Sequence, residues 1–578
     1  MLRNAAVIGL QFAARLLEEV ERRLHGTAGV GPQLDRLTEL GMLEARPEAV
    51  ERTFAFTHIL TQETVYNSLL HSQRPMLHRT VAESIEFLYS SDVINQAEAL
   101  AHHYDRARVR DRAMLYAVLA GNRARQRFAN QEAIEYYSRA LQLAQHLSGH
   151  ESARWQAAMG LGDVEQLIGE YEEAIAFYQA TLQEWGGATA EDRAWAMLKL
   201  GQVWDKRGDL HEADEWLQQA LRQLEQVRAP VPDLRAQVYS ELGWLNLRRG
   251  DLTAAQRWLE QGLTLVSKTQ FYSVHSSILN RLGAIYFNRG QWQQAVAHVE
   301  QALALRDRLG DVVGYARSLN NLGILKWSSG DWDGAQADYQ RALDMQEKIG
   351  EIEGRAQVCT NLGVLHTTRG NWDKAEGYLT RSLDIAQRIG HPYELALAHM
   401  NLGHLYLLQS RWTDCSSHLN TAATMYEEVG AQSNSNLNTT YYLQGLLCLE
   451  QGQLDAAQQW AKRSHDMLQT MVKETKQEEP PEWGVYEMLV ARIAMARGDL
   501  ANAQRHLERG IKIFTASSNT IEIGRALYWR GVLAIKQHQA ELARKNLTEA
   551  REIFMRLGAA ADLKLVGSQL AQLGVPHN

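Results

Sequence analysis

The chain has few of the residues that mark several common protein classes. Its 578 residues include three cysteines and nine prolines, and they contain no run of 18 apolar residues. Cys359, Cys415 and Cys448 are too few and too scattered for a disulfide framework, and they form no CxxC zinc pair. Scarce proline favours many short helices over a loop-rich β protein. We therefore expect a cytoplasmic, helical protein with no membrane-spanning segment.

The sequence also lacks the signatures of common catalytic and nucleic-acid-binding sites. There are 60 Lys+Arg residues against 68 Asp+Glu, which gives a net charge of −8, and no segment has a sustained basic excess. A nucleic-acid partner is therefore not expected. No GK[ST], HExxH or GxSxG occurs, so we find no P-loop, zinc-protease helix or nucleophile elbow. We predict no enzyme activity, no metal and no cofactor.

What the sequence does contain is an internal repeat. The motif L-G-x-x-x-x-x-x-G-x-[WL] recurs with its first glycine at Gly201, Gly243, Gly283, Gly323 and Gly363, and a variant follows at Gly403. The successive spacings are 42, 40, 40, 40 and 40 residues. A column of small residues confirms the period independently, twelve residues after the first glycine. It contains Ala133, Ala174, Ala213, Ala255, Ala295, Ala335, Ala375, Cys415, Ala457, Ala503 and Ala543. The period predicts about eleven structural units.

The columns predict a pair of packed helices in each unit. A second column of small residues lies seven positions after the first, and a larger residue such as Tyr339 lies between the two. Spacings of 3, 4 and 7 place these residues on one helix face, where small side chains let two helices approach closely. Glycines such as Gly310, Gly350 and Gly390 are expected to end helices in the left-handed conformation. Each unit therefore reads as helix, tight turn, helix and short link.

These residues resemble the tetratricopeptide repeat. The family pattern places a small residue at position 8, Ala at 20, a large residue at 24 and a small one at 27, which correspond here to Gly323, Ala335, Tyr339 and Ala342. The unit is near 40 residues instead of the usual 34, as in the long-repeat variant of kinesin light chains and bacterial regulators. The resemblance implies an all-α fold, a right-handed α-α superhelix of about 11 helix pairs. We predict the array over residues 111–560 and a C-terminal cap over 561–578, with a loop insertion near 471–482.

Residues 1–110 do not carry the repeat. The order of a helix at 33–40, a turn at Gly41, two short strand-like pieces and later helices predicts a small winged-helix-like domain. Such a domain can bind DNA or serve as a packing module. The segment has 12 Arg and no Lys against 14 Asp+Glu, so it lacks the charge of a DNA-binding surface, and we favour the packing module.

The tract FAFTHILTQETVYNSLL, followed by LHRTVAESIE and AEALAHHYDRA, resembles the region after the ATPase core in bacterial signal-transduction ATPases with numerous domains, including those fused to class III cyclases. The resemblance implies a regulatory role. The chain is then the sensor and regulatory C-terminal part of a larger signalling protein, or it acts with an ATPase or cyclase module in cis or trans. The alternative is a free-standing scaffold that binds protein or peptide.

The first helix of each unit is expected to line the concave groove of the superhelix. Counting the first glycine as position 8, the inward positions 2, 5, 6, 9 and 12 carry an asparagine ladder and neighbouring candidates. An Asn amide both donates and accepts, so it can pair with the backbone of an extended peptide. The predicted peptide- or ligand-binding residues are Asn280, Arg281, Asn320, Asn321, Trp327, Asn361, Asn401 and His404. The alternative is that these amides are exposed or bond neighbouring helices.

Two other features have simpler structural explanations. Trp292, Trp332, Trp372 and Trp412 open the second helix of four consecutive units, and we interpret them as packing between units. The adjacent pair His102 and His103 is expected near a helix end, where a structural role is favoured over metal binding.

Overall fold

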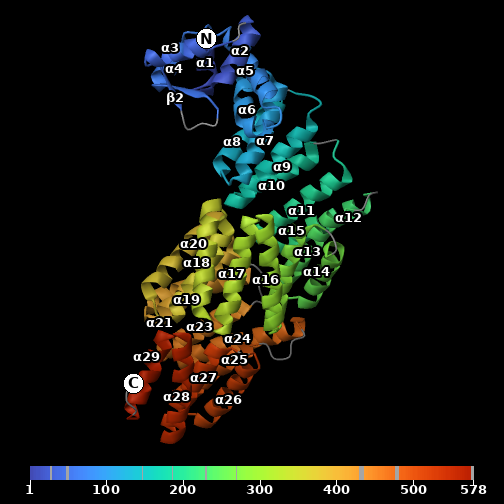
Figure 1. Ribbon diagram of the computed structural model, residues 1–578. Coiled ribbons are helices and arrows are strands. Elements are labelled where there is room, and N and C mark those ends of the chain that lie inside the picture. Colours follow the sequence, from blue (N-terminus) through green and yellow to red (C-terminus); the bar gives the residue numbers. More distant parts are fainter. Residues whose placement is uncertain are drawn as a thin grey trace. The chain divides into compact units, whose positions relative to one another are not determined.

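The computed structural model describes residues 1–26, 29–46, 51–145, 147–184, 187–227, 231–267, 270–428, 435–475, 481–517 and 519–574. These residues form two compact units, one of residues 1–166 and 172–188, the other of residues 167–171 and 189–578. Within the described residues the protein has 29 α-helices and a small three-stranded sheet (Figure 1). No helix in these ranges is both long enough and apolar enough to cross a bilayer.

The first unit begins with the sheet and the helices around it. In chain order these are α1 (Leu2–Ile8), β1 (Gln11–Ala13), α2 (Ala14–His25), α3 (Gly31–Glu39), β2 (Leu43–Arg46) and β3 (Thr53–Phe56). The sheet is antiparallel with the strand order β1-β3-β2. Its core is made of aromatic and aliphatic side chains, with Phe12, Phe54 and Leu34 almost fully buried.

After β3, the residues that the structure describes form helices and no further strands. They are α4 (Ile59–Asn67), α5 (Arg74–Leu88), the 3-10 helix η1 (Val93–Gln96), α6 (Ala97–Arg106), α7 (Arg110–Gln126), α8 (Asn130–Ala144), α9 (Glu151–Ile168), α10 (Tyr171–Glu184), α11 (Ala190–Arg207), α12 (Leu210–Glu225), α13 (Pro232–Arg248), α14 (Leu252–Val266), α15 (Tyr272–Asn288), α16 (Trp292–Leu309), α17 (Val312–Ser329), α18 (Trp332–Ile349), α19 (Ile352–Thr368), α20 (Trp372–Ile389), α21 (Pro392–Leu408), α22 (Trp412–Glu428), α23 (Ser435–Glu450), α24 (Leu454–Thr475), α25 (Glu482–Ala496), α26 (Leu500–Ala516), α27 (Thr520–Lys536), α28 (Ala540–Leu557) and α29 (Ala560–Gln572).

From α7 to α28 the helices form pairs, and the predicted columns lie at the contact between the two helices of each pair. All eleven members of the first column, from Ala133 to Ala543, have an exposed fraction of 0%. Nine of the eleven residues in the second column are alanines, serines or a threonine that are buried, and the other two are glycines. The sequence prediction of a repeated helical solenoid is therefore confirmed.

The glycine at position 8 faces the large residue at position 24 of the same pair. A Cβ atom built on Gly363 would lie 2.5 Å from Cγ of Leu379, and one on Gly323 would lie 2.6 Å from the ring of Tyr339. Any side chain at these positions would overlap its neighbour, because the interior is already close-packed. We call this contact between position 8 and position 24 the seam.

The turns are built as the sequence predicts. Gly310, Gly350 and Gly390 end α16, α18 and α20 with φ of 64°, 75° and 63°, which is the left-handed conformation that glycine adopts without a Cβ clash. At the start of α18, the carboxylate of Asp331 accepts a hydrogen bond from the Gly334 backbone N–H at 3.0 Å. Such a cap satisfies one of the free N–H groups of a first helical turn.

The second unit also brings together pairs that are far apart in the chain. A Cβ atom on Gly330, in the turn between α17 and α18, would lie 2.8 Å from Cδ2 of Leu557 at the end of α28. Trp332, Leu557 and Val566 of α29 belong to one buried apolar cluster. The array therefore winds tightly enough for its last helices to pack against pairs in its middle.

The predicted loop near 471–482 lies partly outside the described residues. Helix α24 continues to Thr475, and α25 begins at Glu482. The first part of the predicted loop is therefore helical, because the second helix of this pair is longer than its counterparts. Residues 476–480 lie outside the described part of the chain.

Candidate functional site

The predicted binding residues lie on the first helices of four consecutive pairs, α15, α17, α19 and α21. We call the face of the first helices that carries positions 2, 5, 6, 9 and 12, together with the charged residues beside it on α11, α13, α17, α19 and α21, the inner face. The seam lies at a different position of the same helices, position 8. The contacts of the predicted binding residues divide them into residues already engaged in the fold and residues with polar atoms left over.

Arg281 and Asn280 of α15 are engaged. The Arg281 guanidinium donates to the Glu241 carboxylate at 2.6 Å and to the Ser240 hydroxyl at 2.7 Å, both on α13. The side-chain oxygen of Asn280 accepts a hydrogen bond from the Ser318 hydroxyl at 3.1 Å. Both residues therefore join neighbouring pairs, and a guest carboxylate at Arg281 would have to compete with Glu241.

The asparagine ladder is partly engaged. Asn361 donates from Nδ2 to Oδ1 of Asn320 at 2.8 Å, which joins α19 to α17. Asn401 donates to the Leu397 carbonyl of its own helix at 2.8 Å. Asn321 is half-buried and makes no side-chain hydrogen bond with the residues that the structure describes. The ladder therefore keeps the whole amide of Asn321 and the oxygens of Asn361 and Asn401 for another partner.

Trp327 and His404 also carry unused polar atoms. The indole N–H of Trp327 is buried and has no hydrogen-bond partner within the described ranges, whereas its backbone carbonyl accepts from Nε1 of Trp332 at 3.1 Å. Burial lowers the pKa of His404 to about 4, with a further contribution from Arg525, so the imidazole is neutral at pH 7 and can both donate and accept.

Next to the ladder lies a group of partly buried ion pairs that sequence reasoning missed. Lys206 of α11 meets Glu353 of α19 at 2.9 Å, although these helices belong to pairs far apart in the chain. Arg248 meets Asp205 at 2.7 Å, and Arg317 meets Glu351 at 2.9 Å. Only the pitch of the superhelix decides which first helices face one another, and no local pattern reports that pitch.

Two carboxylates in this group have pKa values shifted in opposite directions. Burial alone would raise the pKa of Glu353, but Lys206 and Arg317 outweigh it and lower that pKa to about 2. Glu394 has no cation within ion-pair distance among the described residues, and burial, followed by the charge of Glu353, raises its pKa to about 7. The inner face therefore holds fixed charges beside a carboxyl group that titrates near neutrality.

Comparison with known proteins identifies the repeat. Sequence profiles of the tetratricopeptide repeat match residues 156–226, 206–268, 275–348, 353–428 and 394–470, and a second profile of the same repeat matches 118–189. The uncharacterized protein R02095 of Rhizobium meliloti (strain 1021) is 30% identical over 151 residues, which are 26% of this chain. The chain spans about 15% of the length of that relative.

Solved structures similar to this chain include the following three. A Rap protein complexed with competence and sporulation factor is 13% identical with a TM-score of 0.47, over 62% of this chain and 98% of that one. The APC/C hetero-tetramer Cut9–Hcn1 is 14% identical with a TM-score of 0.45, over 87% of this chain and 96% of that one. A signal-transduction ATPase with a tetratricopeptide repeat sensor from Pyrococcus horikoshii is 14% identical with a TM-score of 0.41, over 73% of this chain and 62% of that one. The family assignment rests on the repeat profiles, which cover more than half of the sequence: this chain belongs to the tetratricopeptide repeat family.

Proposed function

We propose that the chain is a non-catalytic, protein- or peptide-binding regulatory module of a signal-transduction system, and that an extended peptide contacts the inner face of α17, α19 and α21. The observation that carries this proposal is the set of unpaired amide atoms, the whole amide of Asn321 and the side-chain oxygens of Asn361 and Asn401, which recur once per pair along consecutive helices. Asparagine inside a helix is less favourable than alanine by up to about 0.7 kcal/mol, so three in one column suggest a use.

The chemistry of this face suits a peptide backbone. The Asn321 amide can donate to a carbonyl and accept from an N–H group of the guest, and the oxygens of Asn361 and Asn401 can accept from further N–H groups, whatever the side chains of the guest are. The neutral imidazole of His404 adds a donor and an acceptor at the same end, and the buried indole N–H of Trp327 adds a donor. The ion pairs beside the ladder favour a guest of low net charge, because a charged guest would have to displace partners already in place.

A triple variant tests the proposal. Peptides selected on the full chain from a random library should lose at least tenfold in affinity for the variant with Asn321→Ala, Asn361→Ala and Asn401→Ala, measured by isothermal titration calorimetry. The control removes exposed amides from a second helix, Gln293→Ala with Gln301→Ala on α16, and should bind as the wild type does. Equal affinity in the triple variant would remove the ladder from the site.

A second candidate function concerns the sensor part of a signalling ATPase or cyclase. The observation that favours it is the element order in residues 2–56, helix-strand-helix-helix-strand-strand with the sheet order β1-β3-β2, which is the order of a winged-helix domain. We propose that this domain is a packing module and does not bind DNA. The charges of α3, the helix in the recognition position, support this proposal, because Asp35 and Glu39 are paired with Arg52 and Arg36.

Two measurements address this second candidate. The full chain should show no salt-dependent DNA binding, whereas a slope of affinity against salt concentration would favour a DNA-binding role. Co-purification with a P-loop ATPase or cyclase encoded next to this chain would favour the sensor function over a free-standing scaffold.

A further inference from the structure

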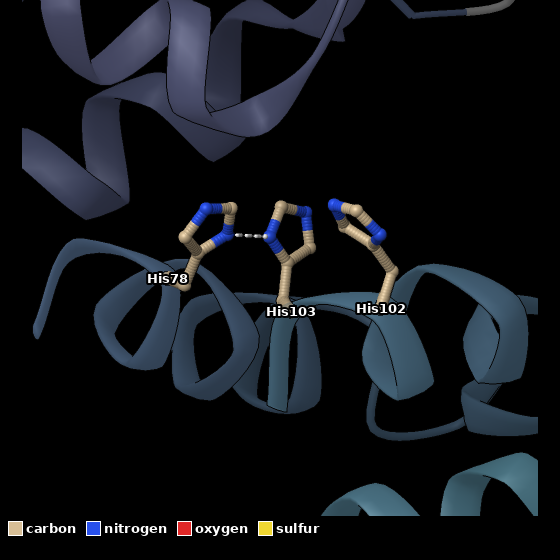
Figure 2. A group of neighbouring side chains, drawn as sticks. All are labelled: His78, His102 and His103. Atoms are coloured by element: carbon tan, nitrogen blue, oxygen red, sulfur yellow. Dashed lines mark hydrogen bonds between the residues drawn. The ribbon is translucent and has the colours of Figure 1, made fainter. Parts of the chain in front are cut away.

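Three histidines from two helices gather in the first unit. His78 lies on α5, and His102 and His103 lie on α6. Nδ1 of His78 is 2.9 Å from Nδ1 of His103, and each of the three residues offers a ring nitrogen within 4.8 Å of the other two. Figure 2 shows the three rings side by side, with His103 in the middle and His102 on its far side from His78. We call this group the histidine triad.

The outer nitrogen of one buried ring is already engaged. Nε2 of His78 is 2.9 Å from the hydroxyl of Tyr66. The His78 ring is therefore held by its outer nitrogen and presents Nδ1 to the His103 ring. Ligating histidines in proteins are held in this way, since a hydrogen bond on the second nitrogen fixes the tautomer and the orientation of the ring.

Either one hydrogen or one metal ion can lie between the two facing nitrogens. Without an ion, one ring donates its Nδ1 hydrogen to Nδ1 of the other ring at 2.9 Å. A metal ion bound at 2.0–2.1 Å from each would place adjacent nitrogens about 2.9–3.4 Å apart, depending on its geometry.

We propose that His78, His102 and His103 bind a divalent transition-metal ion of the class that prefers imidazole, with Zn²⁺ as the reference ion. His102 is exposed, so its ring can turn toward the other two. Arg74 and Arg106 bring positive charge toward His78, and Asp105 brings negative charge toward His102. The two arginines weaken the affinity for a cation, so we expect a micromolar site.

A second histidine pair in the molecule provides an internal comparison. Nδ1 of His399 lies 2.9 Å from Nδ1 of His418, and burial lowers the pKa of His399 to about 4. Within the described ranges no further His, Cys, Asp or Glu completes a ligand set there. The close approach of two imidazoles is therefore not enough to make a metal site, and the third ring distinguishes the triad.

The test uses the full chain without an affinity tag, stripped with a chelator and titrated with Zn²⁺ alone. Calorimetry should show one ion per chain, and bound Co²⁺ should give visible absorption bands of nitrogen and oxygen coordination. His102→Gln should weaken binding at least tenfold, and it keeps the fold because His102 is exposed. His71→Gln, at an exposed histidine of the same unit, and His399→Gln, in the comparison pair, should bind as the wild type does.

Thermal unfolding gives a second readout. A ligand that binds the native state raises the melting temperature, so Zn²⁺ should raise it in the wild type and in the two control variants but less in His102→Gln. An unchanged affinity in His102→Gln, a loss in His399→Gln, or no binding below about 100 μM Zn²⁺ would overturn the proposal.

Discussion

On the seam, each glycine of a first helix meets a large side chain from the second helix of its own pair, whereas on the inner face polar side chains meet partners from other pairs. Gly363 and Leu379 represent the first kind of contact, and Lys206 and Glu353 the second. Seam contacts are local in sequence and apolar, and they are repeated with little change. Inner-face contacts are long-range and individual. The comparison teaches that the repeat stabilises the array, while the deviations from it make one surface available for a specific function.

The largest effect is expected on the seam. Leu379→Ala removes a fully buried side chain that packs on the backbone of Gly363, and the cavity should cost about 2–5 kcal/mol of the free energy of unfolding. Urea unfolding followed by circular dichroism measures this loss. Leu309→Ala, at a leucine with an exposed fraction of 44%, is the control and should change stability by less than about 1 kcal/mol.

One natural exception shows how the seam can be rearranged. In the pair α23–α24 the residue at position 24 is the small Ala461. The space above Gly445 is filled instead by Leu489 of the next pair, and a Cβ atom built on Gly445 would lie 2.6 Å from Cδ2 of Leu489. Gly363→Ala should therefore destabilise the wild type but cost less in the Leu379→Ala background. An additive double variant would contradict the proposed steric contact between these two positions.

The seam could be predicted from the sequence because its two partners lie within one unit. The spacing of Gly323, Ala335 and Tyr339 specifies a helix face by itself, and every repeat tests the same prediction. The helix at 33–40, the turn at Gly41 and the two strands after it could also be read, since turn residues and alternation are local signals, whereas the strand β1 was not predicted. Neither needs knowledge of how the units stack.

The inner face and the histidine triad could not be predicted in the same way. The sequence identified Asn361 but could not show that its amide nitrogen is used by Asn320, and it gave no reason to pair Lys206 with Glu353. The sequence places His103 beside His102, but it does not show that His78, which comes from another helix, lies next to them. These contacts depend on the angle between helices, which is set by the sum of many small packing terms.

The next largest effect concerns the charge of the inner face. The pKa of Glu394 is raised by burial to about 7 in the folded protein, so the folded state binds a proton that the unfolded state has already lost near pH 5. The contribution of this group to stability is therefore present at acid pH and is lost as pH rises through 7, by up to about 3 kcal/mol.

Glu394→Gln tests this sign. The glutamine side chain cannot ionise, so the free energy of unfolding of the variant relative to that of the wild type should rise between pH 5 and pH 8. The histidines that titrate in the same range contribute to both proteins, so their effect cancels in this difference. Urea midpoints at four pH values measure it. Glu353→Gln is the matched comparison: the pKa of Glu353 is lowered to about 2, so its own stabilising contribution is complete above pH 5. The difference should change less than for Glu394→Gln, and only because the lost Glu353 charge no longer helps to raise the pKa of Glu394. A flat difference for Glu394→Gln would show that this carboxylate is ionised and solvated at neutral pH.

The smallest effect separates two neighbouring asparagines. Asn320→Ala removes the acceptor of the Asn361 amide and should lower stability by about 1 kcal/mol, the usual net contribution of one hydrogen bond. Asn321→Ala removes an amide without an internal partner and gains helix propensity, so it should raise stability by a few tenths of a kcal/mol. Both changes are made on the same helix, and thermal unfolding of the two variants provides the comparison. If Asn321→Ala instead lowers stability as much as Asn320→Ala does, then its amide holds the array together like the other inner-face contacts, and the reason to assign it to a guest disappears.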